Sequence, residues 1–269
     1  ASNPGDPRRT GEPGDCTARE TRSALTAPKM KFADLYCGEG GAAEGLHQAF
    51  PDAEIHGFDI EPMPRYPFIF HQANVFDIDW NGYDFIWASP PCQGYSVMRH
   101  LAWNQGKDYP LLIESTRDRL LGTGQYAHQG SVRCPWIIEN VEGARRNMPN
   151  RSGKYLCGLM FGKRFYRHRL FESNFLWLSP PHPKHTMRIR PGHALAGRAR
   201  DILFSEPRAN TANGTRSLEA KGWSAGLGHQ PNASLARAEM GVEWMSSKGM
   251  SQAVPVCYAR HLAQFIPKA

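Results

Sequence analysis

Short apolar runs alternate with glycine-rich turns and helix-like stretches over the first 180 residues. Stretches with helical composition at 42–50 and 111–121 lie between the apolar runs. This alternation is typical of βαβ units, so it predicts an α/β fold with a mainly parallel sheet. The predicted strands lie at 31–36, 55–60, within 68–75, at 83–88 and at 135–141.

The pattern changes after Pro180-Pro181-His182-Pro183, a strong break in any regular element. The next fifty or so residues are rich in Gly, Arg, Asn and Ser and show little periodicity. Two helices are predicted beyond them, at 234–244 and 254–266. An irregular basic insert therefore separates the main body from a helical C-terminal part.

Residues 1–29 have almost no large apolar side chains and are rich in Pro, Gly, Arg, Thr and Glu. Such a segment cannot bury enough surface to offset the entropy lost on ordering. Met30 stands directly before the first predicted strand, so we expect it to be the natural start and residues 1–29 to be a vector remnant. A native disordered arm is the alternative.

The net charge of +7 favours a polyanionic partner, and nucleic acid is the usual one. The six cysteines are widely spaced without a Cys-x-x-Cys pair, which fits a reducing compartment better than a disulfide framework. No signal-peptide core or membrane-length apolar run is found. We expect a cytoplasmic monomer of a bacterial host cell, with no membrane partner.

The segment Asp34–Gly41 runs from a strand into a glycine-rich turn that opens a helix. Glycines there let the backbone approach a ligand closely. Asp59 ends the next strand, where a carboxylate can bind ribose hydroxyls. No Gly-Lys-Ser/Thr follows the turn, so it is not a phosphate-binding P-loop. These features predict a nucleotide-like ligand.

A cysteine, a glutamate and two arginines form the candidate chemistry. Cys92 follows a buried strand and a rigid Pro-Pro pair, so its thiol is a candidate nucleophile at the carboxyl edge of the sheet. Glu139, at the end of another strand, would lie in the same crevice. Arg167 and Arg169 are two residues apart and would share one face of a strand.

Taken together and in this order, these motifs resemble the DNA (cytosine-5) methyltransferase family, and compact phage-encoded members are the most similar. The resemblance covers residues 31–178 and returns at 234–266. It implies a Rossmann-like fold that uses S-adenosylmethionine. It also implies a catalytic and cofactor-binding domain at 30–181, a target-recognition insert at 182–235 and C-terminal helices at 236–269 that pack back on the catalytic domain.

The implied reaction moves a methyl group to carbon 5 of a cytosine flipped out of double-stranded DNA and releases S-adenosylhomocysteine. Cys92 would attack carbon 6, and Glu139 would protonate ring nitrogen N3. Arg169, with Arg167 as a second candidate, would hold the ring carbonyl. The positive field of these arginines would also favour the Cys92 thiolate.

The remaining implied contacts concern the methyl donor and DNA. Asn74 stands where the family has aspartate, and Gln252 stands where it has asparagine, so a modified donor is an alternative. The implied cofactor-binding residues are Tyr36, Gly38, Gly40, Gly41, Asp59, Ile60, Asn74, Pro91 and Gln252. The implied DNA-binding residues are Gln93, Ser96, Arg188, Arg190, Arg198 and Arg200.

Other functions stay open at this stage. One branch of the family methylates cytosine in tRNA, and a binding module without turnover would keep the same fold. Folate-dependent pyrimidine enzymes also use a cysteine, but the glycine turn and Asp59 favour an adenosyl donor. His182 and His185 are three residues apart, but no cysteine or carboxylate cluster nearby in sequence completes a metal site, so no metal is expected.

Overall fold

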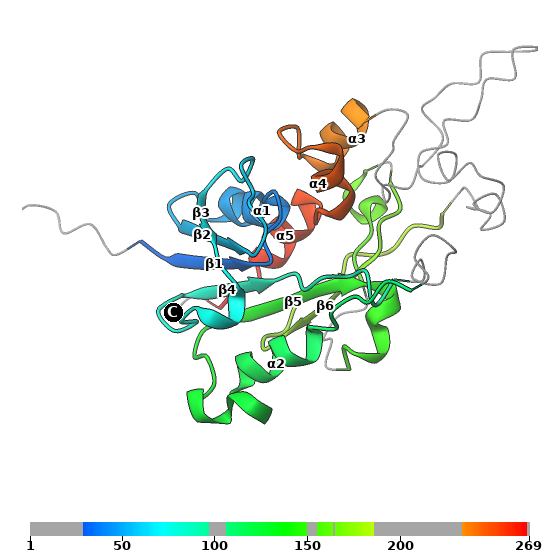
Figure 1. Ribbon diagram of the computed structural model, residues 1–269. Coiled ribbons are helices and arrows are strands. Elements are labelled where there is room, and N and C mark those ends of the chain that lie inside the picture. The colour runs from blue at the N-terminus through cyan, green and yellow to red at the C-terminus, as the bar shows by residue number, and fades with distance from the viewer. Residues whose placement is uncertain (1–28, 97–105, 150–154, 164, 186–232, 268–269) are drawn as a thin grey trace, which may run out of the picture.

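A six-stranded sheet with helices on both faces forms the centre of the protein (Figure 1). The computed structural model describes residues 29–96, 106–149, 155–163, 165–185 and 233–267. The strands are β1 (Lys31–Leu35), β2 (Glu54–Asp59), β3 (Ile69–Gln72), β4 (Phe85–Ala88), β5 (Trp136–Val141) and β6 (Arg169–Ser173).

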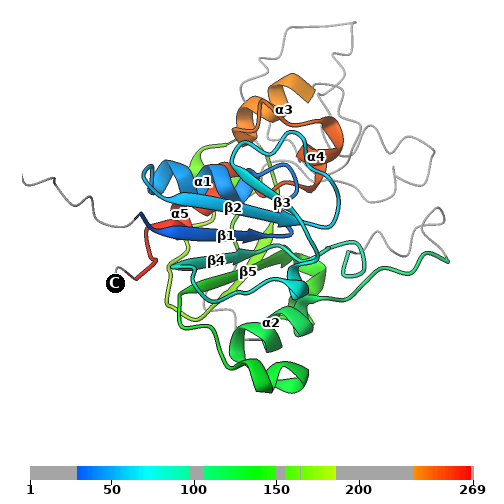
Figure 2. The ribbon, with the colours of Figure 1, turned by 60° about the vertical axis from the view of Figure 1, so that its left-hand side comes forward.

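The spatial order of the strands is β3-β2-β1-β4-β5-β6. Strands β1 to β5 are parallel, and Figure 2 shows β1, β2, β4 and β5 running side by side in one direction. Strand β6 is antiparallel to β5, with Val141 opposite Arg169. The carboxyl ends of β1, β2, β4 and β5 therefore meet the start of β6 at one edge of the sheet, where ligands bind in open α/β folds.

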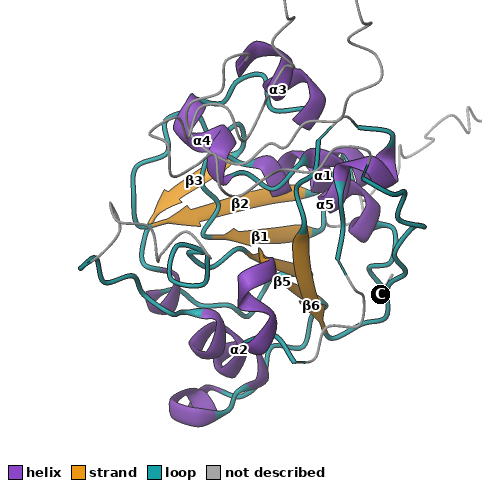
Figure 3. Cartoon of the chain, turned by 90° about the vertical axis from the view of Figure 1, so that its right-hand side faces the viewer, coloured by secondary structure: helices purple, strands orange, loops and turns teal. Residues whose placement is uncertain are grey.

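The helices divide between the two faces of the sheet. Helices α1 and α5 cover one face, α2 covers the other, and α3 and α4 stack beyond α1 and α5 (Figures 1 and 3). The α-helices are α1 (Gly41–Ala49), α2 (Ile113–Leu121), α3 (Ala233–Met240), α4 (Ser247–Gln252) and α5 (Val256–Ala263). Short 3-10 turns span Val75–Asp77, Gly124–Gln129, Glu142–Arg146 and Gly158–Phe161.

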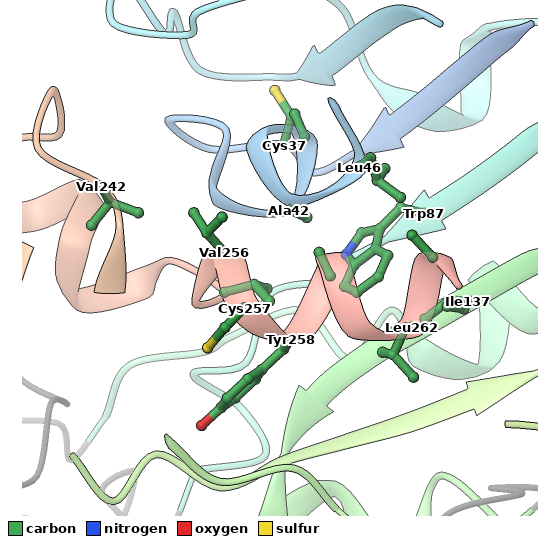
Figure 4. Packing of buried hydrophobic residues seen from close by; sticks show 14 of the residues in the cluster. Cys37, Ala42, Leu46, Trp87, Ile137, Val242, Val256, Cys257, Tyr258 and Leu262 are labelled. Carbon is green, nitrogen blue, oxygen red and sulfur yellow. The ribbon is translucent and has the colours of Figure 1, made fainter. Parts of the chain in front are cut away.

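Alternating strand residues build two cores, one on each side of the sheet. Trp87 and Ile137 belong to the core under α1 and α5, and Figure 4 shows Trp87 reaching from the sheet toward α5, with Leu46 beside it. Ile86 and Ile138, the neighbours of those residues, belong to the core under α2. Burial on both faces explains why the central strand β4 is a continuous apolar run.

The predicted α/β fold with a mostly parallel sheet is confirmed, and several element bounds are corrected. The helix predicted at 234–244 ends at Met240, because Gly241 takes a φ of 72°. Helix α4 was not predicted, and β6 begins at Arg169, so Arg167 lies before the strand. The predicted arm lies almost wholly outside the described residues, as does most of the insert. No described helix is both long and apolar enough to span a bilayer.

Gly45 is the point where α1 approaches α5 most tightly, and it yields a stability prediction. A Cβ at Gly45 would lie 2.5 Å from the carbonyl oxygen of Val256 and 2.6 Å from the Cβ of Ala259. We expect Gly45→Ala to lower the free energy of unfolding by about 1–3 kcal/mol, despite the better helix propensity of alanine. Urea denaturation measures the difference.

The exposed residue Gln48 on the same helix provides the control for this substitution. Gln48→Ala should change the free energy of unfolding by no more than about 0.5 kcal/mol. A Gly45→Ala protein as stable as the wild type would contradict the tight packing of α1 against α5.

Candidate active site

A hydrogen bond from β5 holds the Cys92 loop in place. Asn140, fully buried on β5, donates from Nδ2 to the carbonyl oxygen of Pro90 at 2.9 Å. The carbonyl oxygen of Cys92 accepts hydrogen bonds from the amides of Tyr95 and Ser96, at 3.1 and 3.0 Å. The loop after β4 is thus a tight turn with a fixed position. Sequence reasoning missed Asn140, although it is the middle residue of the Glu-Asn-Val motif.

Glu139 and Arg169 form a buried pair beside this loop. Glu139 is 5% exposed, and its Oε1 lies 2.8 Å from Nε of Arg169. Within the described part of the chain, however, Oε1 accepts no well-directed hydrogen bond. Burial raises the pKa of Glu139, while Arg169, Arg167 and a hydrogen bond from Ser89 oppose that shift. The carboxyl group therefore retains a proton more readily than an exposed glutamate does.

The Cys92 thiol lies in the same electrostatic environment. Burial raises its pKa, and the charges of Arg169 and Arg167 counteract the rise while Glu139 adds to it. The sequence-based expectation of a thiolate favoured by the arginines is therefore only half met. The arginines act in the expected direction, but burial outweighs them in the protein without ligands.

Arg167 has a different set of contacts from Arg169. It is 2% exposed, and its Nε and Nη2 donate to the carbonyl oxygens of Ala253 and Ser251, at 3.1 and 2.9 Å. Burial, followed by repulsion from Arg169, lowers the pKa of Arg167 to about 9. These contacts favour a role in holding the segment after α4, and they leave Arg169 as the arginine paired with Glu139.

The predicted cofactor residues of β1 and β2 meet at the carboxyl edge of the sheet. Asp59 accepts hydrogen bonds from the amides of Gly38 (Oδ2) and Glu61 (Oδ1), both at 3.0 Å. Ile60 beside it is 67% exposed, an uncommon position for a large aliphatic side chain. Tyr36 is the one non-glycine residue of the described chain with a positive φ, at 57°, and such strain is frequent at functional sites.

The other predicted cofactor residues approach this turn from two sides. The amide of Ala73 donates to the carbonyl oxygen of Asp59 at 2.9 Å, which places exposed Asn74 next to Asp59. The Oδ1 of Asn74 accepts from the amide of Phe76 at 3.2 Å. Gln252, exposed at the end of α4, lies between the two residues whose carbonyls Arg167 binds.

Hydrogen bonds from the C-terminal segment hold the glycine turn in place. The carboxylate of Glu39 accepts from the amide and the hydroxyl of Ser246, both at 2.6 Å. The indole of Trp244 donates to the carbonyl oxygen of Glu39 at 2.8 Å. A Cβ at Gly41 would overlap the carbonyl oxygen of Val254, so glycine is needed there. Sequence reasoning did not identify Glu39, which shows no motif beyond its place between two glycines.

The predicted DNA-contacting residues are only partly described. Gln93 and Ser96 lie half-buried on the Cys92 loop, and Pro91 precedes them. Arg188, Arg190, Arg198 and Arg200 lie outside the described residues. The described site therefore combines the thiol of Cys92, the carboxyl group of Glu139 and the guanidinium of Arg169. The glycine turn at the same edge of the sheet has an exposed apolar side chain, Ile60, beside it.

The charges around Cys92 predict how its reactivity depends on pH. Alkylation requires the thiolate, so the rate should rise with pH with a midpoint above that of an ordinary cysteine. Arg169→Gln removes a charge that lowers the pKa and should move the midpoint to higher pH. Glu139→Gln removes one that raises the pKa and should move it to lower pH. Peptide mass spectrometry after iodoacetamide pulses measures each profile.

Cys134 is an internal control in the same experiment. Burial raises its pKa to about 11, and neither Arg169 nor Glu139 contributes to that shift. Its profile should be the same in all three proteins. An unchanged Cys92 profile in both variants would contradict the electrostatic coupling within the site.

No family model matches the chain, and no curated protein matches its sequence significantly. In structure it is similar to the Entamoeba histolytica methyltransferase EhMeth, at 12% identity and a TM-score of 0.49, over 89% of this chain and 98% of that one. It is also similar to the plantazolicin methyltransferase BpumL in complex with SAH, at 16% identity and a TM-score of 0.28, over 46% and 44% of the two chains. A third is the 16S rRNA methyltransferase KamB, at 10% identity and a TM-score of 0.31, over 57% and 89%. Similarities this low assign neither a substrate nor a reaction.

Proposed function

We propose that this protein transfers a methyl group from S-adenosylmethionine to carbon 5 of cytosine in double-stranded DNA. The observation that carries the proposal is the grouping of Cys92, Glu139 and Arg169, in which Oε1 of Glu139 lies 2.8 Å from Nε of Arg169 but accepts no well-directed hydrogen bond from the described residues. Such an atom is suited to a ring nitrogen of a bound base. Folate-dependent chemistry finds less support, because the turn beside the crevice suits an adenosyl group.

The residues of the turn fit such a donor. The carboxylate of Asp59 ends β2, exposed Ile60 offers an apolar surface, and the amide of Asn74 lies close by. Asp34, buried near the end of β1 just before the turn, has an Oδ1 atom without a hydrogen-bond partner within the described chain. This oxygen could accept a hydrogen bond from a bound ligand. S-adenosylmethionine, when bound, supplies an electrophilic methyl group.

Cys92 and Glu139 perform the activating step. The thiolate of Cys92 forms a bond to carbon 6 of cytosine, and the electron pair of the ring double bond moves toward N3. Glu139 donates its proton to N3, which its raised pKa favours. Arg169 stabilises the negative charge that develops on the ring. Carbon 5 thereby becomes nucleophilic enough to accept a methyl group.

Release reverses the first step. A base removes the proton from carbon 5, the ring double bond re-forms, and the bond to the Cys92 sulfur breaks. N3 then returns its proton to Glu139, and the base passes the carbon 5 proton to solvent, so the enzyme is regenerated with balanced charge. Glu139 thus acts as acid and then as base, a role that suits a buried carboxyl group whose pKa is raised by burial and lowered by the charges of Arg169 and Arg167.

A flipped-out base is needed because carbon 6 of a stacked cytosine is not accessible to a thiol at the end of a strand. The net charge of +7 supports a nucleic-acid substrate, and phosphate contacts would make binding sensitive to salt. The same chemistry would serve a tRNA substrate, which is the alternative proposal.

The covalent step predicts a trapped adduct. Fluorine at carbon 5 blocks the final elimination, so duplex DNA rich in 5-fluorocytosine should form a stable adduct with the wild-type protein in the presence of the donor. Cys92→Ser should form none, whereas Cys134→Ser, which also removes a half-buried thiol, should still form it. Denaturing gels with labelled DNA resolve the adduct, and peptide sequencing locates it.

The same assay separates the two substrates. An adduct with 5-fluorocytosine tRNA and none with duplex DNA would replace the DNA proposal by the tRNA one. An adduct that persists in Cys92→Ser would refute the role of Cys92.

Glu139→Gln tests the proton donor. General acid catalysis is worth about 10²–10⁴-fold, so kcat should fall by at least about 100-fold. The Kd for S-adenosylhomocysteine should stay the same, because the described partners of Glu139 are Arg169, Arg167 and Ser89 and not residues of the glycine turn. Labelled-methyl transfer and calorimetry measure the two quantities. Glu114→Gln, an exposed carboxylate on α2, is the control and should retain full activity. A Glu139→Gln protein with wild-type kcat would eliminate the acid role.

A further inference from the structure

We propose that Cys157, His168, His182 and His185 bind one structural zinc ion. These residues come from three separate segments, and their ligand atoms all lie within 4.8 Å of one another. Cys157 precedes the Gly158–Phe161 turn, His168 stands directly before β6, and the other two histidines follow Pro180-Pro181. The sequence alone predicted no metal, and this proposal differs from that prediction.

The ligand atoms are nearly close enough together for one ion to bind all four. The Sγ of Cys157 is 3.5 Å from Nε2 of His185. With Zn–S near 2.3 Å and Zn–N near 2.0–2.1 Å, the ligand atoms of a tetrahedral zinc site are about 3.3–3.7 Å apart. Roughly 1 Å of side-chain movement would therefore bring the most distant pair into range.

Two buried nitrogens in the cluster lack partners. Neither Nε2 of His168 nor Nε2 of His182 has a well-directed hydrogen bond among the described residues, although both are buried and His168 interacts with the Cys157 thiol. Buried polar atoms in folded proteins nearly always have a partner. One ion at the centre of the cluster would satisfy both nitrogens.

The surroundings of the cluster also suit a metal. Nδ1 of His168 lies 3.0 Å from a carboxylate oxygen of Glu142, which directs the other ring nitrogen, Nε2, toward the cluster. A carboxylate that orients a histidine in this way is typical of zinc ligands. His185 stacks on Tyr166 at a centroid distance of 4.0 Å, and Tyr155 packs on His168 at 4.5 Å. These rings cover part of the cluster, whose three histidines are partly exposed.

The four ligands indicate which ion would bind and whether it would be structural or catalytic. One thiolate and three imidazoles suit zinc and are poor ligands for magnesium or calcium. Four protein ligands leave no position for water or substrate, so the ion would be structural. His168 lies between Arg167 and Arg169, and the ion would therefore tie the start of β6, together with residues 182–185, to the Cys157 segment.

Metal analysis of the full chain, purified from zinc-supplemented cells, tests the site directly. We expect about one zinc per chain in the wild type, and loss of zinc to a competing chelator in the double variant Cys157→Ser/His185→Ala. The matched control Cys134→Ser/His128→Ala, which alters a cysteine and a histidine outside the cluster, should keep the ion. Zinc content equal in both double variants would overturn the proposal.

Cobalt exchange on the wild-type protein keeps the test decisive if the double variant does not fold. Co²⁺ should replace zinc and show the intense d–d absorption of a tetrahedral ion together with a thiolate-to-cobalt charge-transfer band. Removal of the metal should lower the Tm, and zinc should restore it. Wild-type protein that contains no zinc, and that shows no cobalt spectrum on reconstitution, would refute the site.

Discussion

The candidate site depends on how buried charge is compensated. Arg167 and Glu139 are buried near the Cys92 loop, Arg169 beside them is partly buried, and an uncompensated buried charge is strongly destabilising. Arg167 is satisfied by two backbone carbonyls, and Arg169 is paired with Glu139. The crevice therefore carries one positive charge more than its carboxylate balances. In the proposed reaction, this excess of positive charge would stabilise the anion that forms on the Cys92 sulfur and then on the bound ring.

The same contacts connect the chemistry to the stability of the fold. Arg167 holds the segment between α4 and α5, while the hydroxyl of Tyr258 on α5 donates to the Arg167 carbonyl at 2.6 Å. Asn140 connects β5 to the Cys92 loop. Few of these groups can be replaced without loss of packing as well as of reactivity, so activity measurements need the stability controls that accompany them.

Much of the fold could be predicted from the sequence, because the central strands β1, β4 and β5 are rich in buried apolar residues and the glycine turn has a recognisable pattern. Helix α4 was not predicted, since the six residues Ser247–Gln252 show little apolar periodicity. The sequence also did not predict the carbonyl partners of Arg167, the hydrogen bonds between Glu39 and Ser246, or the Cys157 cluster. Each depends on segments that are distant in sequence and meet only in the folded chain. The roles of the insert and its arginines stay predictions.

The hydrogen bonds between Glu39 and Ser246 also determine when the glycine turn can take its final structure during synthesis of the chain. Glu39 and Ser246 are 207 residues apart. At about 5–20 residues per second, the ribosome needs on the order of 10–40 s to add those residues. The glycine turn leaves the ribosome early but obtains its partner only when the C-terminal segment emerges. A partly synthesised chain therefore lacks the contacts that hold the glycine turn, and the turn reaches its final environment only when Ser246 has been made.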